Sequence, residues 1–352
     1  MDETRSQEFA GRAVGIFNDA AIALMLSIGH KTGLLDAMAE LPPSTSDGIA
    51  KAAGLQERYV REWLGALTTG GIMEHDPESM TFVLPPEHAA WLTRAAGPAN
   101  LAAQMQYLGM IAEVEDQIVE RFRIGGGVPY SAFSKFHAIM AEDSAAVHDA
   151  TLIDGILPMV PGIVGRLHAG IDVADIGCGS GHALNLMAEA FPASRFTGFD
   201  LSGEAISVAW GEAERKGLGN VRFEARDAAT LDGSEQFDFI TTFDAIHDQA
   251  RPDLALAGIA GSLRPGGTYL CVDIKGSSTI AGDMEHPLAP FLYTISTMHC
   301  MTVSLADGGM GLGTMWGERT AREMLAAAGF TSIDLRENDE DITNNYYIAT
   351  KG

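Results

Sequence analysis

The sequence is poor in cysteine and in positive charge. Its three cysteines, Cys178, Cys271 and Cys300, are scattered and form no CxxC pair. This spacing argues against a disulfide framework and against a zinc knuckle. Lysine and arginine together number 23, against 47 aspartates and glutamates, so the formal net charge is −24. A chain with this charge repels polyphosphates at long range, and the composition therefore favours a small-molecule ligand over a nucleic acid.

Targeting and membrane segments are also lacking. The chain begins Met-Asp-Glu-Thr-Arg, with acids where a secretory signal would have a basic region. No uninterrupted apolar run approaches the ~18 residues that a bilayer-spanning helix needs. We therefore expect a cytoplasmic protein without a membrane partner. The 352 residues, 46% of them hydrophobic, are sufficient for two domains with a sizeable core.

Residues 1–90 have the pattern of a small helical domain. Apolar positions recur at helical spacing between residues 15 and 40. Two more helices are expected over residues 48–53 and 57–68, and two short extended segments over residues 72–75 and 81–84. Helices followed by a hairpin predict a winged helix.

A winged helix often binds DNA, but the charges here favour another role. The helix in the recognition position carries Arg58 and Arg61, which Glu57 and Glu62 offset, and the hairpin is not basic. We expect this domain to serve dimerisation or substrate capping, so that the protein is a homodimer through its N-terminal domain.

The rest of the chain predicts a helical connector and an α/β domain. Residues 91–165 are expected to be helical, with a break at residues 125–129. From residue 166 to 352, strands alternate with helices, and the expected strands are residues 172–176, 195–200, 221–225, 237–243, 267–273, 332–335 and 346–350. This order predicts a Rossmann-like, seven-stranded and mostly parallel sheet with one antiparallel edge strand.

The most informative segment is Val-Ala-Asp-Ile-Gly-Cys-Gly-Ser-Gly, residues 173–181. A hydrophobic strand here ends in a glycine-dense turn that passes directly into a helix. Because Gly177, Gly179 and Gly181 have no Cβ, the backbone can turn sharply and approach a nucleoside-bearing cofactor closely. The spacing Asp-x-Gly-x-Gly-x-Gly, with Asp175 placed to hold an amino group, favours S-adenosylmethionine over a dinucleotide.

Two further acids follow strands of the same predicted sheet. Asp200 ends the strand after the glycine turn and is placed to accept both ribose hydroxyls of an adenosine. Asp227 ends the next strand, where it can reach an adenine amino group, and Ala228 can offer a backbone N–H to the ring. Ligands of open α/β sheets bind at these carboxyl ends, so the three segments predict one cofactor site.

Together with Leu263-Arg264-Pro265-Gly266-Gly267, these motifs resemble the class I S-adenosylmethionine-dependent methyltransferases over residues 150–352. A winged helix before such a domain is similar to the small-molecule methyltransferases that dimerise through their N-terminal halves, which include aromatic O-methyltransferases. The resemblance implies S-adenosylmethionine as cofactor, bound by Asp175, Gly177, Gly179, Gly181, Asp200, Leu201, Asp227, Ala228 and Phe243.

The segment after the fourth strand carries the candidate for chemistry. Ile246-His247-Asp248-Gln249 resembles the Leu-His-Asp-Trp segment that supplies a catalytic histidine in aromatic O-methyltransferases, with the tryptophan replaced. A histidine with an ordinary pKa can take a proton from a phenol or an enol as the oxygen or carbon attacks the methyl group. We expect His247 to act as this general base.

A second candidate, His299, lies in a Met-rich and Gly-rich insertion over residues 276–317 that is expected to form a wall of the acceptor pocket. If His299 turns inward it approaches His247, and two imidazoles beside Asp248 suit non-haem iron. Similar methyltransferases that C-methylate aryl-2-oxo acids use a histidine pair on iron, so the resemblance implies an alternative in which His247 and His299 hold this metal. Glu318 is a further candidate to orient a histidine or complete the site.

Three functional hypotheses therefore stand. The first is methyl transfer to a small aromatic or enolisable molecule with His247 as base, and the second is iron-dependent C-methylation of a 2-oxo acid. The third, from another class, is a DNA-binding regulator that senses S-adenosylmethionine. The acidic charge of the chain disfavours the third.

Overall fold

The computed structural model describes residues 1–338 and 341–352. Two compact units are present, Met1–Ala112 and Glu113–Gly352. The division lies within residues 91–165, the segment expected to connect the domains. Each unit has its own hydrophobic core.

The first unit is a helical domain with a two-stranded wing. Trp63 lies in its core, with its indole N–H donating to the carbonyl of Met25 at 2.8 Å. β1 and β2 pair antiparallel, and Phe82 of the wing also pairs with Ser44. This confirms the predicted winged helix. The elements in order are α1 (Glu3–Thr32), α2 (Leu34–Glu40), α3 (Ser46–Ala53), α4 (Glu57–Thr69), β1 (Glu74–Asp76), β2 (Thr81–Val83), α5 (Pro86–Leu92), η1 (Arg94–Ala99), α6 (Leu101–Gln104) and α7 (Gln106–Ala112).

Helix α1 is longer than the sequence pattern predicts and most of its first two thirds is exposed. Its exposed apolar side chains include Phe9, Val14, Ile16 and Phe17. Among the described residues, α1 is the single unbroken helix that is long and apolar enough to span a membrane, and its most apolar stretch has a mean hydropathy of 1.4. The segments Phe136–Met159 and Ile163–Ala169 meet the same criteria only if the two, which are bent against each other, are counted as one span. Core helices of globular proteins meet the same criteria, so this finding carries no assignment.

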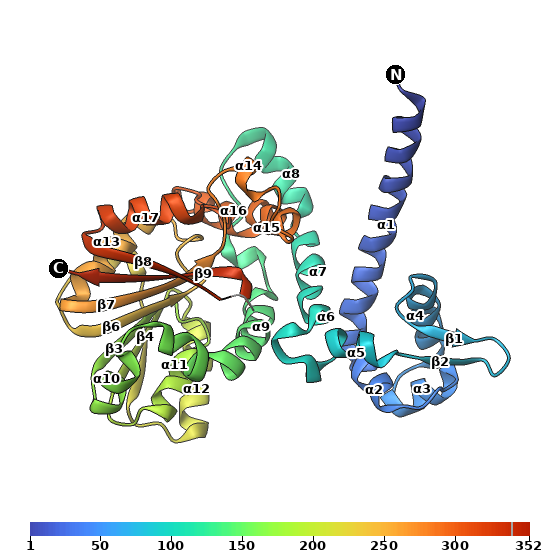
Figure 1. The fold of residues 1–352 in the computed structure, drawn as a ribbon, viewed down its shortest axis with the longest axis horizontal. Coiled ribbons are helices and arrows are strands. Elements are labelled where there is room, and N and C mark those ends of the chain that lie inside the picture. Colours follow the sequence, from blue (N-terminus) through green and yellow to red (C-terminus); the bar gives the residue numbers. More distant parts are fainter. Residues whose placement is uncertain (339–340) are drawn as a thin grey trace. The chain divides into compact units, whose positions relative to one another are not determined.

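The second unit is built on a seven-stranded sheet of order β5-β4-β3-β6-β7-β9-β8 (Figure 1). β3 to β7 pair in parallel, with Val173 opposite Phe196 of β4 and Phe239 of β6. The predicted α/β fold with a mostly parallel sheet is confirmed. The strands are β3 (Asp172–Ile176), β4 (Arg195–Asp200), β5 (Val221–Ala225), β6 (Phe237–Phe243), β7 (Leu263–Ile274), β8 (Phe330–Asn338) and β9 (Asp341–Lys351).

One detail of the predicted sheet is wrong. The antiparallel strand is β9, and it lies between β7 and β8 rather than at the edge. Its segment Tyr346-Tyr347-Ile348-Ala349 is buried on both faces, which requires cover that an edge strand does not have. The last strand therefore enters the sheet, and β8 becomes the edge.

Helices cover both faces of this sheet (Figure 1). One hydrophobic core joins α10 (Ile163–Ala169), α11 (His182–Ala190) and α12 (Gly203–Lys216) to side chains such as Phe196 and Phe239. A second core joins α13 (Pro252–Ser262) and α17 (Gly317–Ala327) to the opposite face through Tyr269 and Tyr347. This arrangement is doubly wound, so the carboxyl ends of β3, β4, β5, β6 and β7 share one edge.

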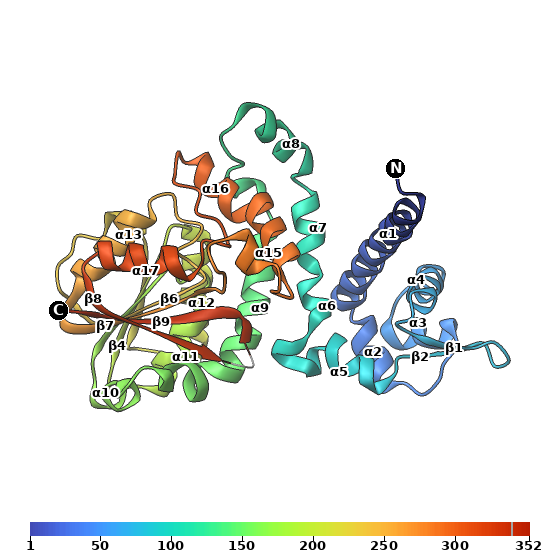
Figure 2. The ribbon, with the colours of Figure 1, turned by 45° about the horizontal axis from the view of Figure 1, so that its top comes forward.

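Further helices lie near that edge. The insertion after β7 folds into α14 (Ile280–Asp283), α15 (Ala289–Ile295), the π-helical turn η6 (Ser296–Cys300) and α16 (Met301–Ala306). Figure 2 shows this insertion close to α8 (Glu115–Ile124), and Val303 shares a small core with Val114, Ile118 and Val128. The remaining elements are η2 (Tyr130–Ala132), α9 (Phe136–Thr151), η3 (Leu152–Ile156), η4 (Leu157–Met159) and η5 (Ala228–Thr230).

Candidate active site

The glycine turn lies between β3 and α11 and has the geometry that glycine permits. Gly177, Gly179 and Gly181 have φ values of 73°, 52° and 72°. A Cβ on Gly177 would lie 2.5 Å from that of Ala245, and one on Gly181 would lie 2.6 Å from that of Ala209. At Gly179, by contrast, an added Cβ would meet no atom within 4 Å. The turn is therefore packed from behind and open at Gly179, as a cofactor cradle requires.

Asp200 lies directly beside this turn. One carboxylate oxygen accepts the Gly179 N–H at 2.8 Å, and the other accepts the Ser202 N–H at 2.8 Å. Asp175 lies deeper, with 2% of its surface exposed, and accepts a hydrogen bond from the Thr241 hydroxyl at 2.8 Å. Burial raises the pKa of Asp175 to about 7. Asp200 thus braces the turn at its surface, whereas Asp175 supports it from within the sheet.

The other predicted cofactor residues follow neighbouring strands along the same edge. Asp227 follows β5 and accepts the Ala229 N–H at 2.9 Å, which starts the short turn η5 at Ala228. Leu201 follows β4 and is 72% exposed. Phe243 ends β6, and its ring meets that of His148 edge to face at 4.8 Å. The structure therefore distributes these residues over the ends of β4, β5 and β6, next to the glycine turn.

His247 is held by a buried carboxylate that the sequence motifs did not single out. Its Nδ1 bonds to Asp273 at the end of β7 at 2.7 Å, and Asp273 is fully buried. The same carboxylate accepts the Trp316 indole N–H at 3.0 Å and the Ile246 backbone N–H at 3.3 Å. Burial lowers the pKa of His247, but the charge of Asp273 more than offsets this, and the pKa lies well above its ordinary value. Asp273 therefore fixes the orientation of the ring and stabilises its protonated form.

Two more acids stand close to this pair. Asp248 is half-buried and interacts with the charges of His247, Asp273 and Asp200, and desolvation raises its pKa to about 6. Asp244 has a φ of 51°, which non-glycine residues rarely adopt, and one of its carboxylate oxygens is buried with no partner among the described residues. Burial and the neighbouring Asp273 raise the pKa of Asp244 to about 8. The edge thus concentrates carboxylates around His247.

His299 lies in the π-helical turn η6 and is completely buried, with no hydrogen-bond partner for either ring nitrogen among the described residues. Burial lowers its pKa to about 3. Three aromatic rings surround it: Phe136 stacks at 3.8 Å and 9°, while Phe133 and Tyr130 meet it edge to face at 4.6 and 5.2 Å. No sequence motif points to these three rings around His299. Their only sequence signal is the spacing of three aromatics at every third residue.

The ion pairs of Glu318 and Lys135 place them outside this arrangement. Glu318 begins α17 and accepts a hydrogen bond from Arg322 at 2.6 Å, with 43% of its side chain exposed. Lys135 pairs with Glu113. No contact of Glu318 with His247 or His299 is found among the described residues, so its position gives no support for the expected catalytic role.

The iron alternative also lacks support in the geometry. Among the described residues, no three histidine, cysteine, aspartate or glutamate side chains are grouped as a metal site. Nδ1 of His247 is already bonded to Asp273, and the His299 ring is enclosed by Phe136, Phe133 and Tyr130. As they stand, these residues do not fit the predicted histidine pair on iron.

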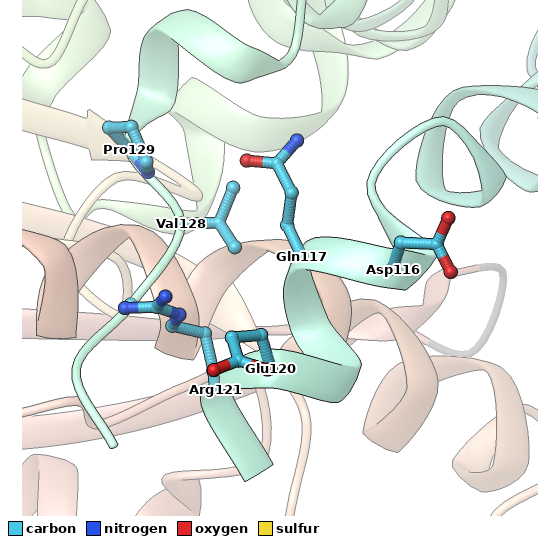
Figure 3. A pocket seen from close by; sticks show the side chains of 7 residues that line it. Asp116, Gln117, Glu120, Arg121, Val128 and Pro129 are labelled. Atoms are coloured by element: carbon cyan, nitrogen blue, oxygen red, sulfur yellow. The ribbon is translucent and has the colours of Figure 1, made fainter. Parts of the chain in front are cut away.

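The segment between α8 and η2 is anchored to the insertion. A Cβ on Gly127 would lie 1.8 Å from the carbonyl oxygen of Thr302, so only glycine fits against α16. The next residue, Val128, donates its N–H to the Thr302 hydroxyl at 2.8 Å. Figure 3 shows the surface hollow of about 430 Å³ beside it, between α8 side chains such as Gln117 and Arg121 and the Val128–Pro129 segment. This hollow contains none of the predicted site residues; the anchored segment instead positions Tyr130.

Comparison with protein families identifies both parts of the chain. Residues 20–94 match the Rv2258c-like winged HTH domain, and residues 167–329 match a family described as methyltransferase domain. Residues 167–329 form a methyltransferase domain. The methyltransferase domain includes the glycine turn, Asp200, Asp227, His247, Asp273 and His299.

Curated proteins with similar sequences match this chain over part of their own length. A fatty-acid O-methyltransferase of Mycolicibacterium smegmatis is 31% identical over 103 residues, which cover 29% of this chain and 37% of the relative. A trans-aconitate 2-methyltransferase of Streptomyces avermitilis is 34% identical over 106 residues, 30% of this chain and 39% of the relative. The chain thus spans less than half the length of these relatives.

Solved structures share the fold over nearly the whole chain. Human N-acetylserotonin methyltransferase in complex with S-adenosylmethionine has a TM-score of 0.68 at 16% identity, covering 97% of this chain and 98% of that chain. An O-methyltransferase family protein from Burkholderia thailandensis has a TM-score of 0.65 at 16% identity, again covering 97% and 98%. At this identity the likeness establishes the architecture of a winged helix followed by a methyltransferase domain.

Proposed function

We propose that this protein transfers a methyl group from S-adenosylmethionine to a small molecule. The glycine turn supports the cofactor assignment, because it is closed behind Gly177 and Gly181 and open at Gly179. Asp200 stands beside the opening, and its oxygens retain lone pairs for the ribose hydroxyls. Solved relatives of the same architecture include one in complex with S-adenosylmethionine, which agrees with this use of the turn.

The observation that carries the proposed chemistry is the buried bond between His247 and Asp273. Because Asp273 holds Nδ1, the acceptor proton must go to Nε2, and Cys300 is the other group that interacts with this ring. S-adenosylmethionine, when bound, supplies an electrophilic methyl group whose sulfur leaves without assistance. A cationic cofactor next to His247 disfavours the imidazolium and so shifts the ring toward its basic form. His247 is then the general base and Asp273 its positioning residue.

Oxygen is the acceptor atom that this arrangement suits best. A hydroxyl loses a proton as it attacks, which is the step that a neutral imidazole assists. The names of the relatives agree, since those of M. smegmatis and B. thailandensis are O-methyltransferases or members of such a family. Iron-dependent C-methylation of a 2-oxo acid remains the alternative to be tested, and metal analysis of the purified protein decides it: it requires bound iron that is lost in both His247→Ala and His299→Ala.

We further propose that the protein is a homodimer that uses α1. The exposed part of α1 carries the large apolar side chains Phe9, Ile16 and Phe17, and several exposed apolar side chains on one helix favour a partner surface. DNA binding is not favoured, because Arg58 and Arg61 of α4 are paired with Glu62 and Glu57. A DNA mobility shift that weakens steeply with salt would contradict this view.

The cofactor assignment is tested by calorimetry with S-adenosylmethionine and its demethylated product S-adenosylhomocysteine. We expect both to bind the native protein and to lose at least ~100-fold in affinity in Asp200→Ala, since a charge-assisted grip on two hydroxyls is removed. Asp334→Ala, which removes an exposed acid on the edge strand β8, is the matched control and should bind normally. Unchanged affinity in Asp200→Ala would refute the placement of the cofactor.

A further inference from the structure

His182 stands where the glycine turn enters α11, and both of its ring nitrogens are bonded to carboxylates. Nδ1 lies 2.8 Å from an oxygen of Glu212 on α12, and Nε2 lies 2.9 Å from an oxygen of Asp149 on α9. The residue directly follows Gly181, and 21% of its side chain is exposed. The imidazole therefore joins the start of α11 to the two helices that lie beside it (Figure 1).

This arrangement requires a positively charged ring. An ionised carboxylate has no hydrogen to donate, so each of the two contacts needs an N–H on the imidazole. Neutral imidazole has one N–H, and its other nitrogen would turn a lone pair toward a carboxylate oxygen. Only the imidazolium of His182 makes both contacts at once, as charge-assisted hydrogen bonds.

The partner on α12 belongs to the packing that closes the glycine turn. Asn185, which is completely buried, donates its amide N–H groups to the second oxygen of Glu212 at 3.2 Å and to the carbonyl of Ala209 at 3.3 Å. Ala209 lies one turn before Glu212 and packs behind the glycine turn, where a Cβ on Gly181 would lie 2.6 Å from its own. The bond of the imidazole to Glu212 therefore fastens the start of α11 to the side chains that support the turn from behind.

The partner on α9 stands next to a residue that contacts a second cofactor segment. His148, directly before Asp149, meets the ring of Phe243 edge to face at 4.8 Å. Burial and the charge of His182 lower the pKa of His148 to about 4, so His148 is neutral near pH 7. The last part of α9 thus contacts the start of α11 through Asp149 and the end of β6 through His148.

The charged groups around this imidazole come from three helices. Lys216 is paired with Glu189 at 2.6 Å, and its charge also interacts with those of Glu212 and Asp149. Histidine is the side chain that ordinarily changes its charge between about pH 5 and 8, and His148 is neutral throughout most of this range. The described titratable groups facing His182 are Asp149 and His148 on α9, Glu212 and Lys216 on α12, and Glu189 on α11 itself.

From these observations we propose that His182 is a positioning residue for the cofactor. As an imidazolium it ties the start of α11 to α9 and α12, and so holds the glycine turn in the geometry that binds S-adenosylmethionine. When the ring loses a proton, one of the two bonds is lost and the turn is no longer held from both sides. The proposal rests on the proposed cofactor site and adds that its affinity is linked to one proton.

Binding of S-adenosylhomocysteine tests this link, because it reports on the cofactor site without an acceptor. Its affinity for the full-length native protein and for His182→Gln is measured by calorimetry from pH 6 to pH 9. Glutamine can bond one of the carboxylates but carries no charge, so at pH 6 we expect it to weaken binding at least about fivefold. The ratio of the two affinities should fall toward one as the pH rises and the native ring loses its proton. A ratio that is independent of pH would reduce His182 to a structural residue and overturn the proposal.

Asp149→Asn gives a second test on a side chain that is 60% exposed, so the fold is at little risk. This variant should weaken binding at pH 6, and it should add nothing in the His182→Gln background, because Asp149 acts on the turn through the ring. Asp154→Asn is the matched control, since it removes an exposed acid of η3 that has no contact with His182 among the described residues. Additive losses in the double variant, or an equal loss in Asp154→Asn, would refute the coupling.

Failure of the proposed function has a different outcome. If the native protein does not bind S-adenosylhomocysteine at any pH, the cofactor placement itself is wrong. If the native protein binds it and neither His182→Gln nor Asp149→Asn differs from the control, the cofactor assignment stands and the role of His182 is refuted.

Discussion

Replacing Asp273 by asparagine tests the central pair of the site. Asp273 receives three N–H donors on one oxygen, from His247 at 2.7 Å, Trp316 at 3.0 Å and the Ile274 backbone at 2.9 Å. Its other oxygen accepts the Ile246 backbone N–H at 3.3 Å. Asparagine has the same shape but no charge, and its amide nitrogen would face one of these donors. The variant therefore removes the negative charge that pairs with His247. It also places the asparagine N–H next to another N–H donor, so that neither can bond to the other.

The expected cost to stability follows from these contacts. A hydrogen bond to a charged group contributes about 1.5–3 kcal/mol, and loss of one partner of a buried pair costs about 3–5 kcal/mol. Since asparagine keeps part of the hydrogen bonding, we expect Asp273→Asn to lower the free energy of unfolding by about 2–4 kcal/mol at pH 6.

The pH dependence of this cost has a definite sign. In the folded protein the pKa of His247 is raised above 6.5, so its pairing with Asp273 stabilises fully below pH 6.5. This contribution is lost as the pH rises through the folded-state pKa. The difference between native protein and variant, measured by denaturant unfolding, should therefore be largest at pH 6 and smaller in alkaline buffer. A difference that is constant with pH would refute the ionic pairing.

Catalysis gives an independent measure of the same variant. His247 must be unprotonated to act as a base, so the acid limb of kcat/KM against pH should lie above 6.5 in the native enzyme. In Asp273→Asn burial lowers the pKa of His247 unopposed, and the limb should move to lower pH. At the native optimum we expect kcat/KM to fall about 10²–10⁴-fold because the ring is no longer oriented. If kcat/KM falls but its acid limb stays at the native pH, Asp273 does not set the pKa of His247 and has only a structural role.

Three further predictions concern other parts of the molecule. His299→Phe should raise the free energy of unfolding, or leave it unchanged, because it removes two buried nitrogens that have no partner among the described residues, each costing about 1–3 kcal/mol; thermal denaturation that shows a lower midpoint contradicts this. Phe17→Glu should convert a dimer to monomer in light scattering after gel filtration, because Phe17 is 76% exposed in an apolar stretch of α1, whereas Glu8→Gln should not. Gly127→Ala should lower the thermal midpoint, since its Cβ would meet the α16 backbone, and an unchanged midpoint would show that this contact does not hold the segment in place.

The sequence was sufficient for most of the fold because its signals are local. The run from Val173 to Gly181 contains both a strand pattern and a turn that glycine alone permits, and the structure has β3 and α11 on either side of it. Four predicted strands have the bounds of β3, β4, β5 and β6. The position of β9 could not be predicted in this way, because strand order depends on which partner covers the buried Tyr346–Ala349 segment rather than on any residue within it.

The candidate site was predictable only where a motif is continuous. Asp200 and His247 stand at strand ends that the pattern of strands already locates. Asp273 ends a strand too, but its sequence Val-Asp-Ile has no motif, and its importance depends on a contact with His247 across 26 residues. Tyr130 and Phe136 lie still farther away, in a segment whose composition resembles an ordinary connector. Residues that act through tertiary contacts leave no local signal, so the acceptor side of the site needed the structure.

Several buried polar atoms of the described residues lack hydrogen-bond partners near one edge of the sheet. The described buried atoms without partners include oxygens of Asp244, Asn344 and Asn345 and nitrogens of His148 and His299. Asp244, Asn344 and Asn345 lie at or just beyond the strand edge where the glycine turn also ends, and His148 touches Phe243 at the same edge. A fold selected for stability alone would fill these positions with apolar side chains. The group of these residues near the edge that carries the glycine turn is therefore better explained by ligands that complete their hydrogen bonds there.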